Sequence, residues 1–337
     1  MSIEIVLHPG SGSKEEIKQH LLMLGFRSCQ HLWDWPEESL HFHWFEEREN
    51  LSFDGVEATI FPRRAEEKLR EPGSDWGLHT RTRASASMGD LKQQNFLIRT
   101  ARKKFGGIFE NDWHGRNRYI PIEKDRRDAV ARGIYLCYEN ARERLAAVRY
   151  ALPSPIQTFQ KLMGTKLEGM ARLDPTRVLY NALVPFAVAA LEHFFSQSFK
   201  ILLRYEQPAK ERLLQQSKKI DIVEVLAIRD GKKTIEDVVA DWYSFQSISS
   251  IHAAFHEWFG IDFWRIIRHR KKIGKRLLFL ERRFTELIEF RHGLVHRFEI
   301  NTQLQKEQIE EILDLSRALI EVFIDELEKR RGTPIRD

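Results

Sequence analysis

The chain has 337 residues, a net charge of +5 and a mildly basic isoelectric point near 9.1. This length exceeds the usual size of one hydrophobic core, so two domains are expected, and the composition excludes a disordered or fibrous chain. Two cysteines are too few for a disulfide framework, and no stretch approaches the roughly 18 consecutive apolar residues of a membrane span, so a cytoplasmic protein without membrane contact is predicted.

The N-terminal part mixes short strand-like segments with helical ones. Strands are predicted at residues 3–6, 40–45, 56–61, 107–110 and 118–122, and helices at 14–24, 91–105 and 139–151. Ser13 and Glu16 form a capping box for the first helix, and the second and third strands are spaced as a hairpin. The sequence therefore predicts an α+β domain over residues 1–152, which we interpret as a recognition or sensing domain.

Residues 153–175 contain several prolines and glycines and are predicted to be a linker. Beyond them every substantial segment has helical periodicity. Helices are predicted at residues 177–205, 211–228, 235–245, 251–267, 277–298 and 302–329. Thr302 and Gln305 supply a capping box for the last one. Residues 176–331 are thus expected to form an all-α bundle.

A basic run without any acidic residue precedes the predicted helix at residues 277–298. It contains Arg265, Arg268, Arg270, Lys271, Lys272, Lys275 and Arg276. Such a run is either a solvated face or loop, or a phosphate-binding rim for RNA.

The same helix carries a charged residue on its apolar face. Its apolar stripe, continued at intervals of three or four residues, reaches Arg291, and a polar stripe beside it carries Glu289, His292 and His296. A guanidinium on a core-facing stripe is costly unless it is paired or points into a polar cleft or an interface. One interpretation is an ion pair with Glu192 and solvated histidines. Another is a zinc site at the two histidines, but this lacks a clear third ligand, so no metal is predicted.

The segment R-H-G-L-V-H, Arg291 to His296, resembles the R-x4-6-H signature of the HEPN superfamily, including the polar residue after the arginine. The resemblance covers the C-terminal half alone and implies a HEPN-like bundle that cleaves RNA without metal or cofactor. By this analogy the ribose 2′-OH attacks the adjacent phosphate. His296 is then the acid–base residue, Arg291 stabilises the phosphorane, and His292 orients the substrate or leaving group. Glu192 and Glu289 are predicted to support them.

Helical geometry adds an expectation about assembly. Arg291 and His296 project about 140° apart on a straight helix, so either the helix loosens at Gly293 or two copies contribute to one site. HEPN nucleases are typically dimers, so a homodimer is expected. The resemblance further implies a role in prokaryotic toxin–antitoxin, abortive-infection or anti-phage systems, with an antitoxin or sensor as partner. The alternative is a non-catalytic HEPN module that binds RNA, nucleotide or a protein.

The N-terminal domain also contains polar residues of uncertain role. A set that either binds a nucleotide or an RNA end, or lies on an ordinary surface, comprises His79, Arg81, Arg83, Asn95, Arg99, Asp112 and His114. His41 and His43 share one strand face and are predicted to be structural.

Overall fold

A computed structural model describes residues 2–30, 35–46, 51–83, 86–122, 127–152, 175–273 and 276–336. The chain divides into two compact units, Met1–Arg126 and Arg127–Asp337. The predicted linker, apart from Pro175, and the basic residue Lys275 lie outside the described residues. Each unit has its own hydrophobic core.

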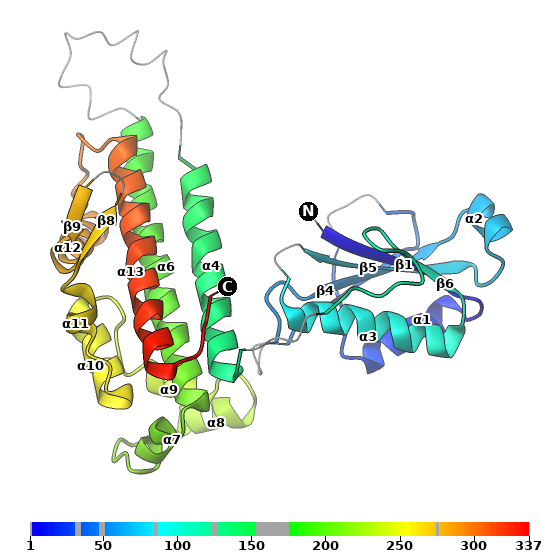
Figure 1. The fold of residues 1–337 in the computed structure, drawn as a ribbon, viewed down its shortest axis with the longest axis horizontal. Coiled ribbons are helices and arrows are strands. Elements are labelled where there is room, and N and C mark those ends of the chain that lie inside the picture. The colour runs from blue at the N-terminus through cyan, green and yellow to red at the C-terminus, as the bar shows by residue number, and fades with distance from the viewer. Residues whose placement is uncertain are drawn as a thin grey trace, which may run out of the picture. The chain divides into compact units, whose positions relative to one another are not determined.

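The first unit is a seven-stranded antiparallel sheet with helices α1 and α3 on one face (Figure 1). The strand order is β2-β3-β4-β5-β1-β6-β7. Its elements are β1 (Ser2–His8), α1 (Lys14–Met23), β2 (Arg27–Ser28), β3 (Leu40–Trp44), β4 (Val56–Pro62), α2 (Ala65–Arg70), β5 (Trp76–Arg83), α3 (Met88–Phe105), β6 (Ile108–Asn111) and β7 (Gly115–Arg116).

Strand alternation gives this sheet one apolar and one polar face. Ile5, Leu7 and Leu78 are fully buried and belong to the same core as Ile17 of α1 and Leu97 of α3. Because successive side chains of a strand point to opposite faces, the residues between them lie on the other face of the sheet. That face is largely polar, although Val6 and Phe61 also lie on it, and its polar residues include Glu4, His8, Glu57, Thr59, His79, Arg81 and Glu110.

The structure confirms much of the predicted N-terminal pattern. The first strand, the first helix with its Ser13–Glu16 capping box and the β3–β4 hairpin are present. The predicted strand at residues 118–122 is wrong, because the chain there is irregular and Asn95 of α3 hydrogen-bonds the Ile120 backbone. Strand β5, at the centre of the sheet, was not predicted.

The second unit is helical with one short hairpin. Its elements are α4 (Ala129–Tyr150), α6 (Pro175–Tyr205), α7 (Gln207–Leu214), α8 (Ile222–Arg229), α9 (Ile235–Ala240), α10 (Ile248–Phe259), α11 (Phe263–Ile267), β8 (Arg270–Ile273), β9 (Arg276–Phe279), α12 (Leu280–His296) and α13 (Lys306–Arg331). The long helices α4, α6 and α13 lie alongside one another (Figure 1). Edge-to-face phenylalanine contacts join Phe195 of α6 to Phe323 of α13 and Phe263 of α11.

The boundary between the units differs from the predicted one at residue 152. Helix α4 packs on α6 and α13, and Ile134 and Ala141 of α4 are fully buried in the helical core. Arg331 of α13 also pairs with Asp128 before α4, at 2.7 Å. The sequence pattern placed this helix in the N-terminal domain because it lies before the proline-rich segment, whereas its apolar stripe is covered by the bundle.

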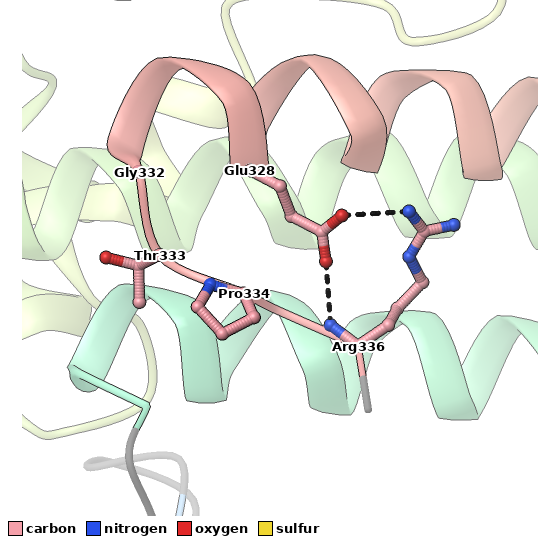
Figure 2. Close-up of a pocket in the computed structure, with 5 residues that line it drawn as sticks. All are labelled: Glu328, Gly332, Thr333, Pro334 and Arg336. Atoms are coloured by element: carbon pink, nitrogen blue, oxygen red, sulfur yellow. Dashed lines mark hydrogen bonds and ion pairs between the residues drawn. The ribbon is translucent and has the colours of Figure 1, made fainter.

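The C-terminal segment folds back onto α13 (Figure 2). Glu328 accepts hydrogen bonds from the backbone amides of Ile335 and Arg336, each at 2.9 Å, and pairs with the Arg336 guanidinium at 2.8 Å. Ile335 is fully buried in the helical core. A small surface cavity of about 470 Å³ lies here, beside Gly332 and Pro334. The chain end is therefore anchored to the bundle.

Several predicted helices are interrupted. The predicted helix at 211–228 is two helices, α7 and α8, and that at 251–267 breaks at Gly260, where φ is 63°. The unit is not all-α, because much of the basic run forms the β8–β9 hairpin. The last helix is capped by Gln305 with Gln308, not by Thr302.

Helix α6 is long and apolar enough to cross a membrane by length and composition. Half of its most apolar window is buried inside the unit, and it contacts α4, α12 and α13. These contacts are those of the central helix of a bundle and are compatible with a soluble protein.

Candidate functional site

Arg291 lies near the C-terminal end of α12 and faces α6. Its guanidinium nitrogen Nη2 is 3.6 Å from Oε1 of Glu192, and about a fifth of each side chain remains exposed. This is the predicted contact, but it is an ion pair without a hydrogen bond, because Oε1 of Glu192 is buried and has no hydrogen-bond partner. Burial raises the pKa of the Glu192 carboxyl, and the charge of Arg291 opposes that rise. Arg291 is therefore held loosely by a carboxylate that is itself poorly solvated.

His292 and His296 lie on the solvent-facing side of the same helix. Both side chains are exposed, and their ring centroids are 4.6 Å apart at an angle of 40°. Glu289, one turn before His292, is also exposed. The predicted polar stripe is thus present, with two imidazoles in contact at the surface.

Helix α12 continues without interruption through Gly293. The backbone carbonyl of Gly293 accepts hydrogen bonds from the amides of Arg297 and Glu299, each at 3.1 Å, and the helix ends at His296. Of the two expected alternatives, loosening of the helix at Gly293 is therefore not seen. At about 100° per residue, Arg291 and His296 point in directions that differ by about 140°. A single copy does not aim both side chains at one phosphate.

The loop after α12 docks on the start of α6. Asn181 of α6 exchanges two hydrogen bonds with the Asn301 backbone, at 2.9 and 3.0 Å, and Arg177 donates to the carbonyl of Thr302. Exposed apolar side chains occur along these two segments. We call this set the α6–α12 apolar patch, and it comprises Val178, Leu179, Phe186, Val295, Phe298 and Ile300.

The basic run is largely paired with carboxylates. Arg265 lies 2.7 Å from Glu326, Arg268 lies 3.5 Å from Glu281, Lys271 lies 3.1 Å from Glu321, and Arg276 lies 4.0 Å from Glu311. Arg270 lies over the Phe279 ring, 4.2 Å from its centroid. Among the described residues, Lys272 has no ion pair. The positive charge that this basic run offers to a polyanion is therefore smaller than the sequence suggests.

One unusual residue beside this site was not predicted. His193 follows Glu192 on α6, and burial, with the charges of Arg144 and Lys200, lowers its pKa to about 4. The signal available in the sequence was a histidine directly before Phe194 and Phe195 in an apolar helical segment. Within the described ranges no group of three His, Cys, Asp or Glu side chains is arranged to hold a metal ion.

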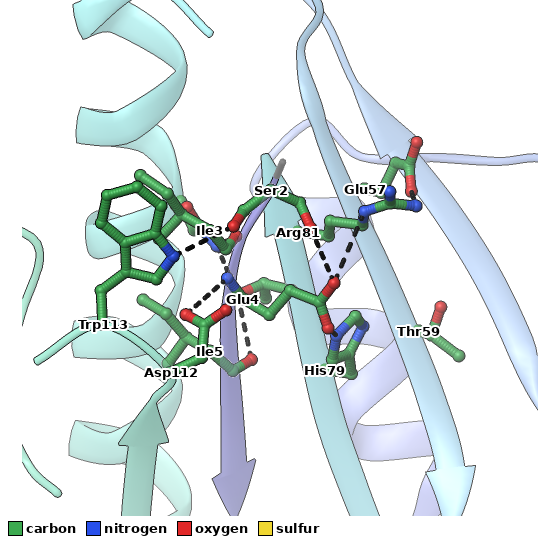
Figure 3. Close-up of polar contacts among 12 residues, drawn as sticks. Ser2, Ile3, Glu4, Ile5, Glu57, Thr59, His79, Arg81, Asp112 and Trp113 are labelled. Atoms are coloured by element: carbon green, nitrogen blue, oxygen red, sulfur yellow. Dashed lines mark hydrogen bonds and ion pairs between the residues drawn. The ribbon is translucent and has the colours of Figure 1, made fainter. Parts of the chain in front are cut away.

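The polar set of the N-terminal unit is divided by the fold. Asn95 and Arg99 belong to α3: the first is bonded to the Ile120 backbone and the second lies over the Tyr119 ring. His79 and Arg81 lie on the open sheet face, where Glu4 contacts both, at 3.0 and 3.7 Å (Figure 3). Asp112 accepts a hydrogen bond from the Glu4 amide.

His41 and His43 are bonded within the sheet, as expected of structural residues. Their rings lie 3.0 Å from the Thr59 hydroxyl and from the Asp54 carbonyl, respectively.

Comparison of the chain with protein-family models, with curated proteins and with solved structures found no match.

Proposed function

We propose that the helical unit is a HEPN-type, metal-independent endoribonuclease with Arg291, His292 and His296 as its site. The observation that carries this proposal is the position of Arg291: a half-buried arginine beside two exposed, contacting histidines, on a helix followed by one last long helix. A guanidinium in such a place has donors left for phosphate oxygens, because its contact with Glu192 is not a hydrogen bond.

In the proposed reaction a histidine takes the proton of a ribose 2′-OH, whose oxygen then attacks the adjacent phosphorus. The bond from phosphorus to the 5′-oxygen breaks, and that oxygen receives a proton. The products are a 2′,3′-cyclic phosphate and a 5′-hydroxyl end. Arg291 stabilises the charge that develops on the phosphorane, and His296 is the proposed acid–base residue.

The divergence of Arg291 and His296 on a continuous helix favours a site shared by two subunits. The α6–α12 apolar patch lies on α6, at the end of α12 and in the loop that follows α12, and it would be covered in a two-fold dimer. We therefore propose a homodimer in which Arg291 of one subunit works with His296 of the other.

The test uses purified protein and total RNA in excess EDTA, with DNA of matched length as a negative substrate. Arg291→Ala and His296→Ala are expected to lower the cleavage rate by about a thousandfold each. The matched controls are Arg297→Ala on the same helix end and His256→Ala on α10, which are expected to keep wild-type activity. Loss of wild-type cleavage in EDTA would instead indicate a metal-dependent site.

Mixing the two inactive variants tests the shared site. If each site combines residues of two subunits, random exchange gives half heterodimers with one intact site each, and up to about a quarter of the wild-type rate returns. No recovery, in a mixture shown to exchange subunits, would place both residues in one subunit.

A second candidate is a non-catalytic module that binds RNA, nucleotide or a protein. It is favoured by the ion pair that partly neutralises Arg291 and by the carboxylates that pair with the basic run. Wild-type protein that binds RNA but never cuts it would support this candidate.

The cellular role that we propose is cytoplasmic toxicity or anti-phage defence, controlled by an antitoxin or sensor partner. It predicts growth arrest on expression in bacteria, relieved by Arg291→Ala.

A further inference from the structure

A second candidate site lies on the open face of the N-terminal sheet and shares no residue with the proposed nuclease site. A cavity of about 650 Å³ opens there between β1, β5, β6 and Trp35. Its lining includes Glu4, His8, Trp35, Phe61, His79 and Glu110. The volume is in the range of small-molecule sites or of a pocket for one or two side chains.

One wall of the cavity is aromatic. The Trp35 ring lies 5.6 Å from the Phe61 ring and 5.1 Å from the His79 ring, measured between centroids. His79 is held by Glu4 at 3.0 Å, and Glu4 also lies 3.7 Å from Arg81 (Figure 3). The three rings therefore pack against one another, and the faces of aromatic rings attract cations.

The rest of the lining carries several acidic side chains. Glu67, Glu110 and Asp112 line the cavity, and none of them has an ion pair among the residues that the structure describes. The one arginine in the lining, Arg116, already pairs with Glu71. An anion such as a phosphate group would meet uncompensated carboxylates here, so a nucleotide or RNA end is disfavoured.

The imidazoles of the cavity are also suited to accept hydrogen bonds. Burial lowers the pKa of both His8 and His79, which keeps the two rings neutral near pH 7. Nδ1 of His8 is buried and has no hydrogen-bond partner within the described chain. A neutral imidazole offers one acceptor nitrogen, so carboxylates and imidazoles together favour a ligand rich in N–H donors.

We propose that this cavity binds an organic cation, a guanidinium or primary ammonium group, between the Trp35–Phe61 wall and the carboxylates of Glu67, Glu110 and Asp112. The cation is either a free small amine or a basic side chain of a polypeptide. Both sources share the same chemistry, in which the cation lies against the aromatic wall and its N–H groups donate to the acidic side. This ligand is independent of the nuclease proposal.

The test is calorimetric titration of the full-length protein with three probes at low salt. Agmatine represents the free amine, N-acetyl-arginine-methylamide the side chain, and N-acetyl-citrulline-methylamide the neutral isostere of the latter. Saturable binding of either cation, weakened by added salt and absent for the citrulline probe, is the expected result, and the stronger of the two cations identifies the source.

Variants separate the pocket from general charge. Glu110→Gln is expected to weaken cation binding about tenfold, while Glu15→Gln, on the helix-covered side of the sheet, leaves it unchanged. Circular dichroism and thermal melting establish that each variant is folded, and Glu67→Gln provides a second pocket variant. Equal binding of the citrulline probe, unchanged affinity in both pocket variants, or no saturable binding of either cation would overturn the proposal.

Discussion

Replacement of Glu192 by Gln tests whether the ion pair with Arg291 serves stability or function. The carboxylate lies 3.6 Å from the guanidinium without a hydrogen bond, and burial raises its pKa despite the charge of Arg291. A carboxyl whose pKa is raised by folding favours the folded state while protonated and loses that benefit as the pH rises through its folded pKa. At pH 7 the ionised form therefore costs free energy that the neutral amide avoids.

We expect Glu192→Gln to be more stable than wild type by about 1 kcal/mol at pH 7, a value discounted for the remaining exposure of both side chains. This corresponds to a rise in Tm of about 2–4 °C for a unit of this size. The difference should vanish below the ordinary carboxyl pKa of 4.5. RNA cleavage should nevertheless fall about tenfold, because Arg291 loses the group that orients it.

The measurement is urea unfolding followed by circular dichroism at 222 nm at both pH values, with cleavage assays on the same samples. Glu289→Gln, an exposed carboxylate on α12, is the control and should change neither stability nor its pH dependence. Destabilisation of Glu192→Gln by about 2 kcal/mol or more at pH 7 would refute the reasoning, since it would make the pair a structural anchor.

Three further outcomes are expected. Gly293→Ala should keep activity and change stability little, because the new Cβ would meet the flexible side-chain ends of Glu299, at 2.7 Å, and Arg297, at 3.3 Å. Loss of cleavage would mean that the helix must bend there. Between pH 6.5 and 4, His193→Gln should lose less free energy of unfolding than wild type does. A histidine whose folded pKa is about 4 stabilises the fold above pH 6.5, and this stabilisation is lost as the pH falls towards 4. An unchanged pH profile in chemical unfolding would contradict this expectation. Charge reversal at Arg270 and Lys272 should weaken RNA binding and reduce the slope of log affinity against log salt concentration by about one per residue. Filter binding at several salt concentrations measures this slope. An unchanged slope would exclude the hairpin from the RNA-binding surface.

Local signals in the sequence predicted local features well. Ser13 and Glu16 form their capping box, the β3–β4 hairpin pairs as spaced, and Arg291 occupies the half-buried position that the α12 stripe predicts. Each of these depends on residues a few positions apart, whose geometry the helix or strand period dictates.

Features set by distant partners were missed. Strand β5 alternates Leu78 with His79, but what makes it the central strand is its pairing with β4 and β1, which are distant in the sequence. The position of helix α4 in the sequence suggested the first domain, but its apolar stripe is buried against α6 of the second unit. Lys271 and Arg276 of the β8–β9 hairpin pair with Glu321 and Glu311 of α13, which lie far along the chain, and no local pattern in the sequence shows such pairs.

A sheet that is not closed into a barrel has two edge strands. The unpaired backbone groups of these strands can pair with another chain and lead to aggregation. Here both outermost strands, β2 and β7, are two residues long. Such short edges present few unpaired backbone groups as a template. The unit can therefore leave its polar face uncovered for a ligand while remaining resistant to edge-to-edge aggregation.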